Sequence, residues 1–290
     1  MDTREMMSLF NDYYSIENTL RRRGLDVKDG SQENKVIQIT EKFYYLFKSF
    51  SFRRILKCIY EANKGVSFDG LLNNISNLSS DSLNKKLQLL LDEDCITYNS
   101  ENKVYEKYIK KNYSVTFEWF ISEVFKRELK GISNYSIKIL NLQCGGDFDV
   151  ISRLEDLLVY VECKSGNISN INEGDINNFL YRFKELVPSL ALFIIDTDGL
   201  TDEFKAKFDL VDWETYVMKP NKPYKRRRKG RGIFHELNAK IYIITNESNL
   251  ISNIKLTINH YINFIKPYAF IQPGPNSIAK YYDEYEQQKT

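Results

Sequence analysis

Hydrophobic and polar positions alternate along two short segments in the middle of this 290-residue chain. Residues 144–151 and 158–166 each have the apolar character of a buried β-strand, with charged side chains interleaved among the apolar ones. The segment 152–156 between them is polar enough to form a turn. The pattern therefore predicts a β-hairpin made of these two strands.

The predicted hairpin gathers three charged side chains. Because side chains on a strand alternate between its faces, Glu162 and Lys164 share one face of the second strand, and Val161 and Cys163 share the other. Asp149 lies on the adjacent strand, so the three charged groups can meet at one point. Burying two carboxylates and an ammonium among apolar residues is costly unless they neutralise one another or hold a metal ion. The alternative is a surface hairpin with an ordinary cross-strand Glu–Lys pair.

The remaining pattern predicts helices and strands that alternate around this hairpin. Helical spacing of apolar residues marks 113–130, 176–186, 201–208 and 250–265, and apolar runs mark strands at 135–142, 189–196 and 240–245. This order of elements predicts an α/β fold, in which a mixed sheet is flanked by helices.

Residues 36–110 predict a separate, mainly helical unit. The order of helix, short helix, third helix and a hairpin at 95–108 resembles a winged helix-turn-helix domain. Its third helix would expose Lys85 and Lys86, which could reach phosphates or base edges. Because winged helices also serve as dimerisation or docking modules, DNA contact and dimerisation both stay open.

The overall composition argues against several classes of function. Net charge is only +2, no apolar run approaches the roughly 20 residues of a membrane span, and the charged start lacks the apolar core of a signal peptide. The four cysteines form no CxxC pair, so we expect reduced thiols and a cytoplasmic protein without membrane contact. With only two histidines and no GxxxxGK[ST] loop, histidine-based zinc or triad chemistry and ATP hydrolysis are not expected.

The oxygen ligands at the hairpin favour a hard divalent cation. Mg2+ typically takes one or two carboxylates together with water and phosphate, and Asp149 and Glu162 can supply the carboxylates. The backbone carbonyl of Cys163 lies between Glu162 and Lys164 and is a further candidate ligand. Lys164 could then orient or deprotonate a water for attack on phosphorus. The expected cofactor is Mg2+ or Mn2+.

These residues also carry a family resemblance. Asp149-Val-Ile, followed thirteen positions after the aspartate by Glu162-Cys-Lys164, resembles the signature of the PD-(D/E)XK, or restriction-endonuclease-like, nucleases. The spacing is similar to that of archaeal Holliday-junction resolvases, and the run 145–166 is similar to nucleases that follow CRISPR sensor domains. Phe148 stands where the family name expects proline. The resemblance implies a restriction-endonuclease-like core and metal-dependent cleavage of DNA.

The same resemblance implies one more carboxylate from the helix before the hairpin. Many family members carry a glutamate there, commonly after an aromatic residue or leucine, and Phe117-Glu118 is similar. On a helical wheel Glu118 borders the apolar face, whereas Glu123 points away from it and is the second choice. Glu118 would be an outer metal ligand or a brace for Lys164; the alternative is a solvated glutamate on an amphipathic helix.

A basic segment at 219–232 carries no acidic residue. The side chains in it that we expect to contact nucleic acid are Lys225, Arg226, Arg227, Arg228, Lys229 and Arg231. Such a block can neutralise several phosphates and release their counterions, or it can be a solvated loop without a partner.

The chain is therefore expected to contain an N-terminal extension (1–35), a winged-helix-like domain (36–110), a nuclease-like domain (111–272) and a tail (273–290). We predict a Mg2+-dependent DNA endonuclease that forms a homodimer, with the winged helix positioning or dimerising it. Two alternatives stay open. One is a regulator that binds nucleic acid without cutting it, and the other is a nuclease that acts on RNA.

Overall fold

The chain forms two compact units, residues 1–165 and 166–290. The computed structural model describes residues 15–28, 41–75, 78–108, 112–145, 147–166, 168–198, 226–227, 233–236, 240–247 and 249–265. The predicted domain boundaries near residues 35, 110 and 272 fall outside these ranges and stay predictions. Across the described ranges, every helix is too short or too polar to span a lipid bilayer.

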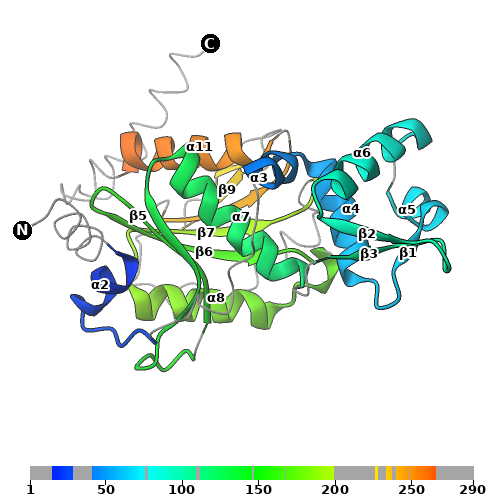
Figure 1. The fold of residues 1–290 in the computed structure, drawn as a ribbon. Helices are drawn as coiled ribbons and strands as arrows, with labels where there is room; N and C mark the ends of the chain where they lie inside the picture. The colour runs from blue at the N-terminus through cyan, green and yellow to red at the C-terminus, as the bar shows by residue number, and fades with distance from the viewer. Residues whose placement is uncertain are drawn as a thin grey trace, which may run out of the picture. The chain divides into compact units, whose positions relative to one another are not determined.

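The first unit begins with a mainly helical part (Figure 1). Its elements are α3 (Glu41–Lys48), α4 (Phe50–Glu61), β1 (Val66–Ser67), α5 (Phe68–Asn74), α6 (Ser80–Asp92), β2 (Ile96–Asn99) and β3 (Val104–Lys107). Strand β3 pairs antiparallel with both β1 and β2, which gives a sheet in the order β1-β3-β2. The Ser67 and Ser79 hydroxyls accept hydrogen bonds from Gly70 and Ser82 in the first turns of α5 and α6, which fixes where these helices begin. The predicted order of helices followed by a hairpin is present.

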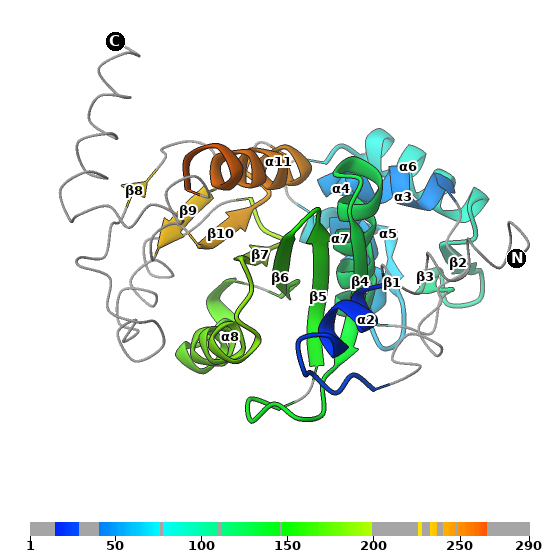
Figure 2. The ribbon, with the colours of Figure 1, turned by 90° about the vertical axis from the view of Figure 1, so that its left-hand side faces the viewer.

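The same unit contains the predicted hairpin in a second, antiparallel set of strands. These are β4 (Ile132–Lys138), β5 (Asp147–Leu154) and β6 (Leu157–Lys164), with β5 paired to both neighbours. Helix α7 (Tyr113–Glu128) packs on one face of the strands and α2 (Ile16–Arg21) on the other (Figure 2). The Asn112 side chain accepts a hydrogen bond from the Val115 N–H and so caps the start of α7.

The predicted turn at 152–156 is wrong in its extent. Strand β5 continues through Leu154, and only Glu155 and Asp156 form the turn, with Glu155 in the left-handed region at φ 52°. Ser152 stays in the strand because its hydroxyl donates to the Ser133 hydroxyl of β4 at 2.6 Å. Arg153 stays because its guanidinium reaches the Thr19 hydroxyl of α2 at 3.1 Å. Polar residues therefore continue the strand where other elements supply hydrogen-bond partners for their side chains.

Aromatic packing joins α3 to α7. The Phe43 ring lies 5.8 Å from that of Trp119, and the Phe47 ring lies 5.1 Å from that of Phe120, measured between centroids. Phe43, Phe47 and Phe120 are buried. The helix that carries Glu118 is therefore part of the same hydrophobic core as α3.

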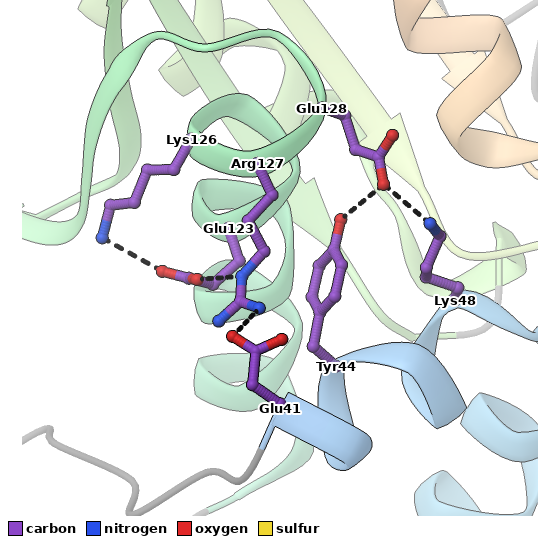
Figure 3. Close-up of polar contacts among 7 residues, drawn as sticks. All are labelled: Glu41, Tyr44, Lys48, Glu123, Lys126, Arg127 and Glu128. Atoms are coloured by element: carbon purple, nitrogen blue, oxygen red, sulfur yellow. Dashed lines mark hydrogen bonds and ion pairs between the residues drawn. The ribbon is translucent and has the colours of Figure 1, made fainter.

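Charged side chains at the C-terminal end of α7 add to this contact (Figure 3). The Arg127 guanidinium bridges Glu123 of its own helix and Glu41 of α3, with both N–O distances at 2.6 Å, and lies 4.6 Å from the Tyr44 ring centroid. One oxygen of Glu128 accepts hydrogen bonds from the Tyr44 hydroxyl and the Lys48 ammonium of α3. Polar and aromatic contacts thus fix α3 against α7.

The second unit is an α/β arrangement with a mixed sheet. Its described elements are the 3-10 turn η1 (Ile168–Asn170), α8 (Glu173–Leu186), β7 (Leu190–Ile195), β8 (Arg226–Arg227), β9 (Ile233–Glu236), β10 (Ile241–Thr245), α11 (Leu250–His260) and the π-helical turn η2 (Tyr261–Ile265). Strand β10 is parallel to β7 and antiparallel to β9, which is antiparallel to β8. Helix α8 packs on β7 through Phe179 and Phe193, and α11 packs on β10. The predicted α/β class with a mixed sheet and flanking helices is confirmed; the predicted helix at 201–208 lies outside the described residues.

Candidate active site

Strands β5 and β6 separate at the predicted site. Strand β5 pairs with β6 from Leu154 back to Val150, and Asp149 is the next residue along. There the Asp149 carboxylate accepts a hydrogen bond from the backbone N–H of Cys163 at 2.7 Å. A side chain thus satisfies a backbone donor of β6, and this contact holds Asp149 against the Glu162–Lys164 end of the strand.

Glu162 is fixed at both of its carboxylate oxygens. The Tyr160 hydroxyl donates to Oε2 at 2.5 Å, and the Lys164 ammonium lies 3.1 Å from Oε1. The Glu162 side chain is 5% exposed and that of Lys164 is 23% exposed. Tyr160 is itself buried, with its ring edge-on to Phe148 at a centroid distance of 5.3 Å. Phe148, which stands where the motif expects proline, is therefore part of the buried core next to the site.

Glu118 reaches the same region from α7. Its Oε2 atom accepts a short hydrogen bond from the hydroxyl of Ser136, a buried residue of β4. The ladder pairs Tyr135 with Val150 and Ile137 with Phe148, which places Ser136 across from Asp149. The structure therefore brings together the predicted residues of α7, β5 and β6.

Negative charge accumulates at this point. Burial raises the pKa of Asp149 well above its ordinary value, and the neighbouring carboxylates of Glu162 and Glu118 raise it further. The Cys163 backbone N–H and the Lys164 ammonium oppose this shift without cancelling it. A carboxyl group whose pKa is raised by neighbouring carboxylates lies in a site that additional positive charge would stabilise.

Cys163 is not a nucleophile in this setting. Burial, followed by the charges of Asp149, Glu118 and Glu162, raises the pKa of its thiol well above the ordinary value. The thiol therefore stays protonated at neutral pH, whereas a reactive cysteine needs a lowered pKa. Its backbone N–H faces the site instead, since it donates a hydrogen bond to Asp149.

The donor set fits a hard cation that takes few protein ligands. Among the described residues, no three His, Cys, Asp or Glu side chains group closely enough to form a metal cage by themselves. Mg2+ commonly binds through one or two carboxylates and completes its shell with water and substrate phosphate. Asp149 and Glu162, with the Cys163 carbonyl, match that smaller set; a zinc-type cage of side chains does not.

The other predicted residues lie apart from this set. Glu123 pairs with Lys126 and Arg127 on α7, so its carboxylate is engaged in the contact with α3. Lys85 is exposed on α6, whereas the Lys86 ammonium lies over the Phe52 ring at 4.3 Å, and burial lowers its pKa.

Most of the basic segment is not described. Lys225, Arg228, Lys229 and Arg231 lie outside the described residues, and Arg226 and Arg227 are placed only by their backbone in β8. The predicted nucleic-acid contacts of these six side chains stay predictions.

Two residues that contact the site were missed in the sequence. Tyr160 stands two positions before Glu162, so strand periodicity already places it on the same face. Ser136 is a small polar residue between the apolar Tyr135 and Ile137 of a predicted strand, which is a signal of a buried hydroxyl with a partner.

The comparisons with known proteins concern the fold. Neither a family model nor a curated protein matches this sequence. Among solved structures, the chain is similar to Can2 from Sulfobacillus thermosulfidooxidans, solved in complex with cyclic tetra-adenylate, with a TM-score of 0.50 and 14% identity over 84% of this chain and 61% of Can2. It is also similar to VC1899 from Vibrio cholerae, with a TM-score of 0.40 and 12% identity over 83% of this chain and 58% of that protein. The chain thus spans about three fifths of either structure, and the likeness to Can2 is one of fold.

Proposed function

We propose that this protein is a Mg2+- or Mn2+-dependent endonuclease that hydrolyses phosphodiester bonds in DNA. The observation that supports it is the convergence of Asp149, Glu162 and Lys164 where β5 and β6 separate, with Glu118 contributing charge from α7. One buried and two half-buried carboxylates that repel one another destabilise a fold, so their presence at one point calls for a function. The arrangement agrees with the PD-(D/E)XK resemblance of the motif.

Each residue has a defined part in this proposal. Asp149 and Glu162 would hold the cation together with the Cys163 carbonyl, and the cation would stabilise negative charge that develops on the phosphate. Lys164, kept beside Glu162 at 3.1 Å, would orient the attacking water and stabilise charge near the phosphate. Glu118 would act as an outer carboxylate close to Asp149.

The helical part of the first unit would place the substrate or pair two copies of the protein. The order of α4, β1, α5, α6, β2 and β3, with β1 added to the β2–β3 hairpin, supports a winged-helix assignment. Exposed Lys85 on α6 could contact a phosphate, while Lys86 is packed against Phe52. Since cutting a duplex takes two active sites or two visits, a homodimer would produce double-strand breaks.

The test is a cleavage assay on the purified full-length protein. Supercoiled and linear DNA and a single-stranded RNA are each incubated with Mg2+, with Mn2+ or with EDTA, beside Asp149→Ala and Glu162→Ala variants. We expect DNA cleavage with either metal, none with EDTA and none by either variant. Cleavage that both variants retain in full would remove the function from these residues.

The same assay decides between the alternatives. Cleavage of RNA alone would replace DNA as the substrate, and tight binding without cleavage would favour a regulator. Can2 was solved with cyclic tetra-adenylate, so that molecule is added in a parallel arm. A change in cleavage on its addition would indicate that this chain responds to a cyclic oligonucleotide.

A further inference from the structure

Ser136 has an unusual backbone for a strand residue. It lies inside β4 and is 5% exposed, yet its φ is +50°, in the left-handed region. Residues with a Cβ atom rarely adopt this region, and those that do are mostly asparagine, aspartate or histidine. Glycine would adopt it without steric cost. The protein has a serine there, so the side chain has a use that outweighs the strain.

The side chain of Ser136 contacts the proposed catalytic set. Its hydroxyl donates a hydrogen bond to Glu118 on α7, while its position in the ladder lies across from Asp149 on β5. The residue therefore binds one of the two carboxylates and neighbours the residue that carries the other. A second serine of the same strand serves as a comparison: Ser133 is also buried, but its hydroxyl contacts the Ser152 hydroxyl and the Ile151 carbonyl instead.

Removal of the hydroxyl would release Glu118 from this contact. Glutamate has three side-chain torsions, and a carboxylate that loses a hydrogen bond samples more rotamers. The charge of Glu118 acts on Asp149 in the present arrangement, so a different rotamer would change that interaction. The left-handed backbone at Ser136 sets the direction in which its hydroxyl points and, through it, the place of Glu118.

We propose that Ser136 is a positioning residue, whose strained backbone and hydroxyl hold Glu118 in place beside Asp149. The inference rests on the proposed nuclease function and adds to it a residue outside the Asp149, Glu162 and Lys164 motif. Two substitutions can distinguish the effect of the hydroxyl from the effect of the strained backbone. Ser136→Ala removes the hydroxyl and keeps the strain, whereas Ser136→Gly removes both.

The experiment compares these variants in DNA cleavage and in thermal unfolding. Both should lower kcat about tenfold, the scale of one hydrogen bond to a charged group, with KM changed less than about twofold. Ser136→Gly should unfold at a temperature about 2–4 °C above that of Ser136→Ala, because only alanine keeps a strained φ. The control Ser133→Ala should lower the unfolding temperature and leave kcat unchanged.

A double variant tests whether Ser136 acts through Glu118. In a Glu118→Gln background, Ser136→Ala should change kcat by less than about twofold, since the group it positions is already altered. The same tenfold loss in both backgrounds, or an unimpaired Ser136→Ala, would overturn the inference and leave the nuclease assignment standing. A wild-type protein that cleaves no nucleic acid would end both.

Discussion

Loss of the Lys164 ammonium should destabilise the fold as well as stop the chemistry. The perturbation is Lys164→Met, which removes the charge and keeps most of the apolar stem. Its nitrogen lies 3.1 Å from Glu162, whose side chain is 5% exposed while that of Lys164 is 23% exposed. The substitution would therefore leave a buried carboxylate that keeps the hydrogen bond from the Tyr160 hydroxyl and loses its neighbouring cation. Asp149 and Glu118, of the same charge, lie nearby.

The expected loss of stability follows from the burial of the Glu162–Lys164 pair. At this separation and an effective dielectric constant of about 20, Coulomb's law gives an attraction of about 5 kcal/mol, much of which desolvation offsets. Exposed pairs keep at most about 1 kcal/mol, and breaking a fully buried pair costs about 3–5 kcal/mol. Breaking a pair with one buried and one partly exposed member should cost an intermediate amount, about 2 kcal/mol. The melting temperature should fall by about 4–8 °C.

A matched control exists on α7. Lys126 and Glu123 are also 3.1 Å apart, but their side chains are 39% and 13% exposed. Lys126→Met should therefore cost less than about 0.5 kcal/mol. The double variant Glu162→Gln with Lys164→Met should regain most of the lost stability, because residue 162 then carries no charge that lacks its partner.

A DNA-cleavage assay separates the effect of these substitutions on stability from their effect on catalysis. Lys164→Met should slow DNA cleavage by roughly 100-fold or more, and the double variant should stay inactive although it is stable again. Lys164→Arg should keep the pair and fail to restore the rate, because a guanidinium is planar and does not deprotonate. Equal melting temperatures for Lys164→Met and Lys126→Met would refute the reasoning about burial, and a fully active arginine variant would reduce the role of Lys164 to charge alone.

Three further predictions concern the rest of the molecule. Asp149→Asn should abolish cleavage and raise the melting temperature at pH 7, because the native pKa of Asp149 is raised. The gain should shrink on acidification and vanish below a pH of about 4, where the carboxyl becomes protonated in the unfolded state as well, and a gain that grows on acidification would contradict this. Neutralising the 226–228 arginines should weaken DNA binding at all sequences. The slope of the logarithm of the binding constant against the logarithm of salt concentration should fall by about 0.9 per lost contact, and an unchanged slope in a binding titration would show that the segment has no phosphate role. Lys85→Ala should reduce DNA affinity at nearly unchanged stability, whereas Lys86→Ala should mainly lower the melting temperature by removing the contact with Phe52. Unchanged DNA affinity in both variants would exclude α6 as a DNA-contacting helix.

The sequence predicted elements and faces better than individual polar contacts. Strand periodicity was enough to place Glu162 and Lys164 on one face of β6 and to pair that strand with the one carrying Asp149. Local pattern alone could not predict that Ser152 continues β5, because its partner Ser133 comes from another strand. Local polarity predicts a turn only when no distant group satisfies the side chain.

The left-handed conformation of Ser136 was equally hidden. No glycine or asparagine marks the position, and the contact that explains it involves Glu118, eighteen residues earlier on a helix. Such a conformation depends on tertiary contacts, so a strand pattern cannot reveal it. Lys86 illustrates the same point, since its helical position predicts exposure and only the fold places its ammonium over Phe52.

The shared core of α3 and α7 constrains how this protein can be recombined. Trp119 and Phe120 directly follow Glu118 in the chain, and their rings pack against Phe43 and Phe47. A chimera that exchanged the α3–β3 region for a foreign module would need matching aromatic residues, or it would leave these rings in water next to the outer carboxylate. Insertions and deletions within the α3–α7 contact should therefore be tolerated less well than changes on the exposed face of α6. In random recombination libraries, functional variants should take residues 41–128 from a single parent.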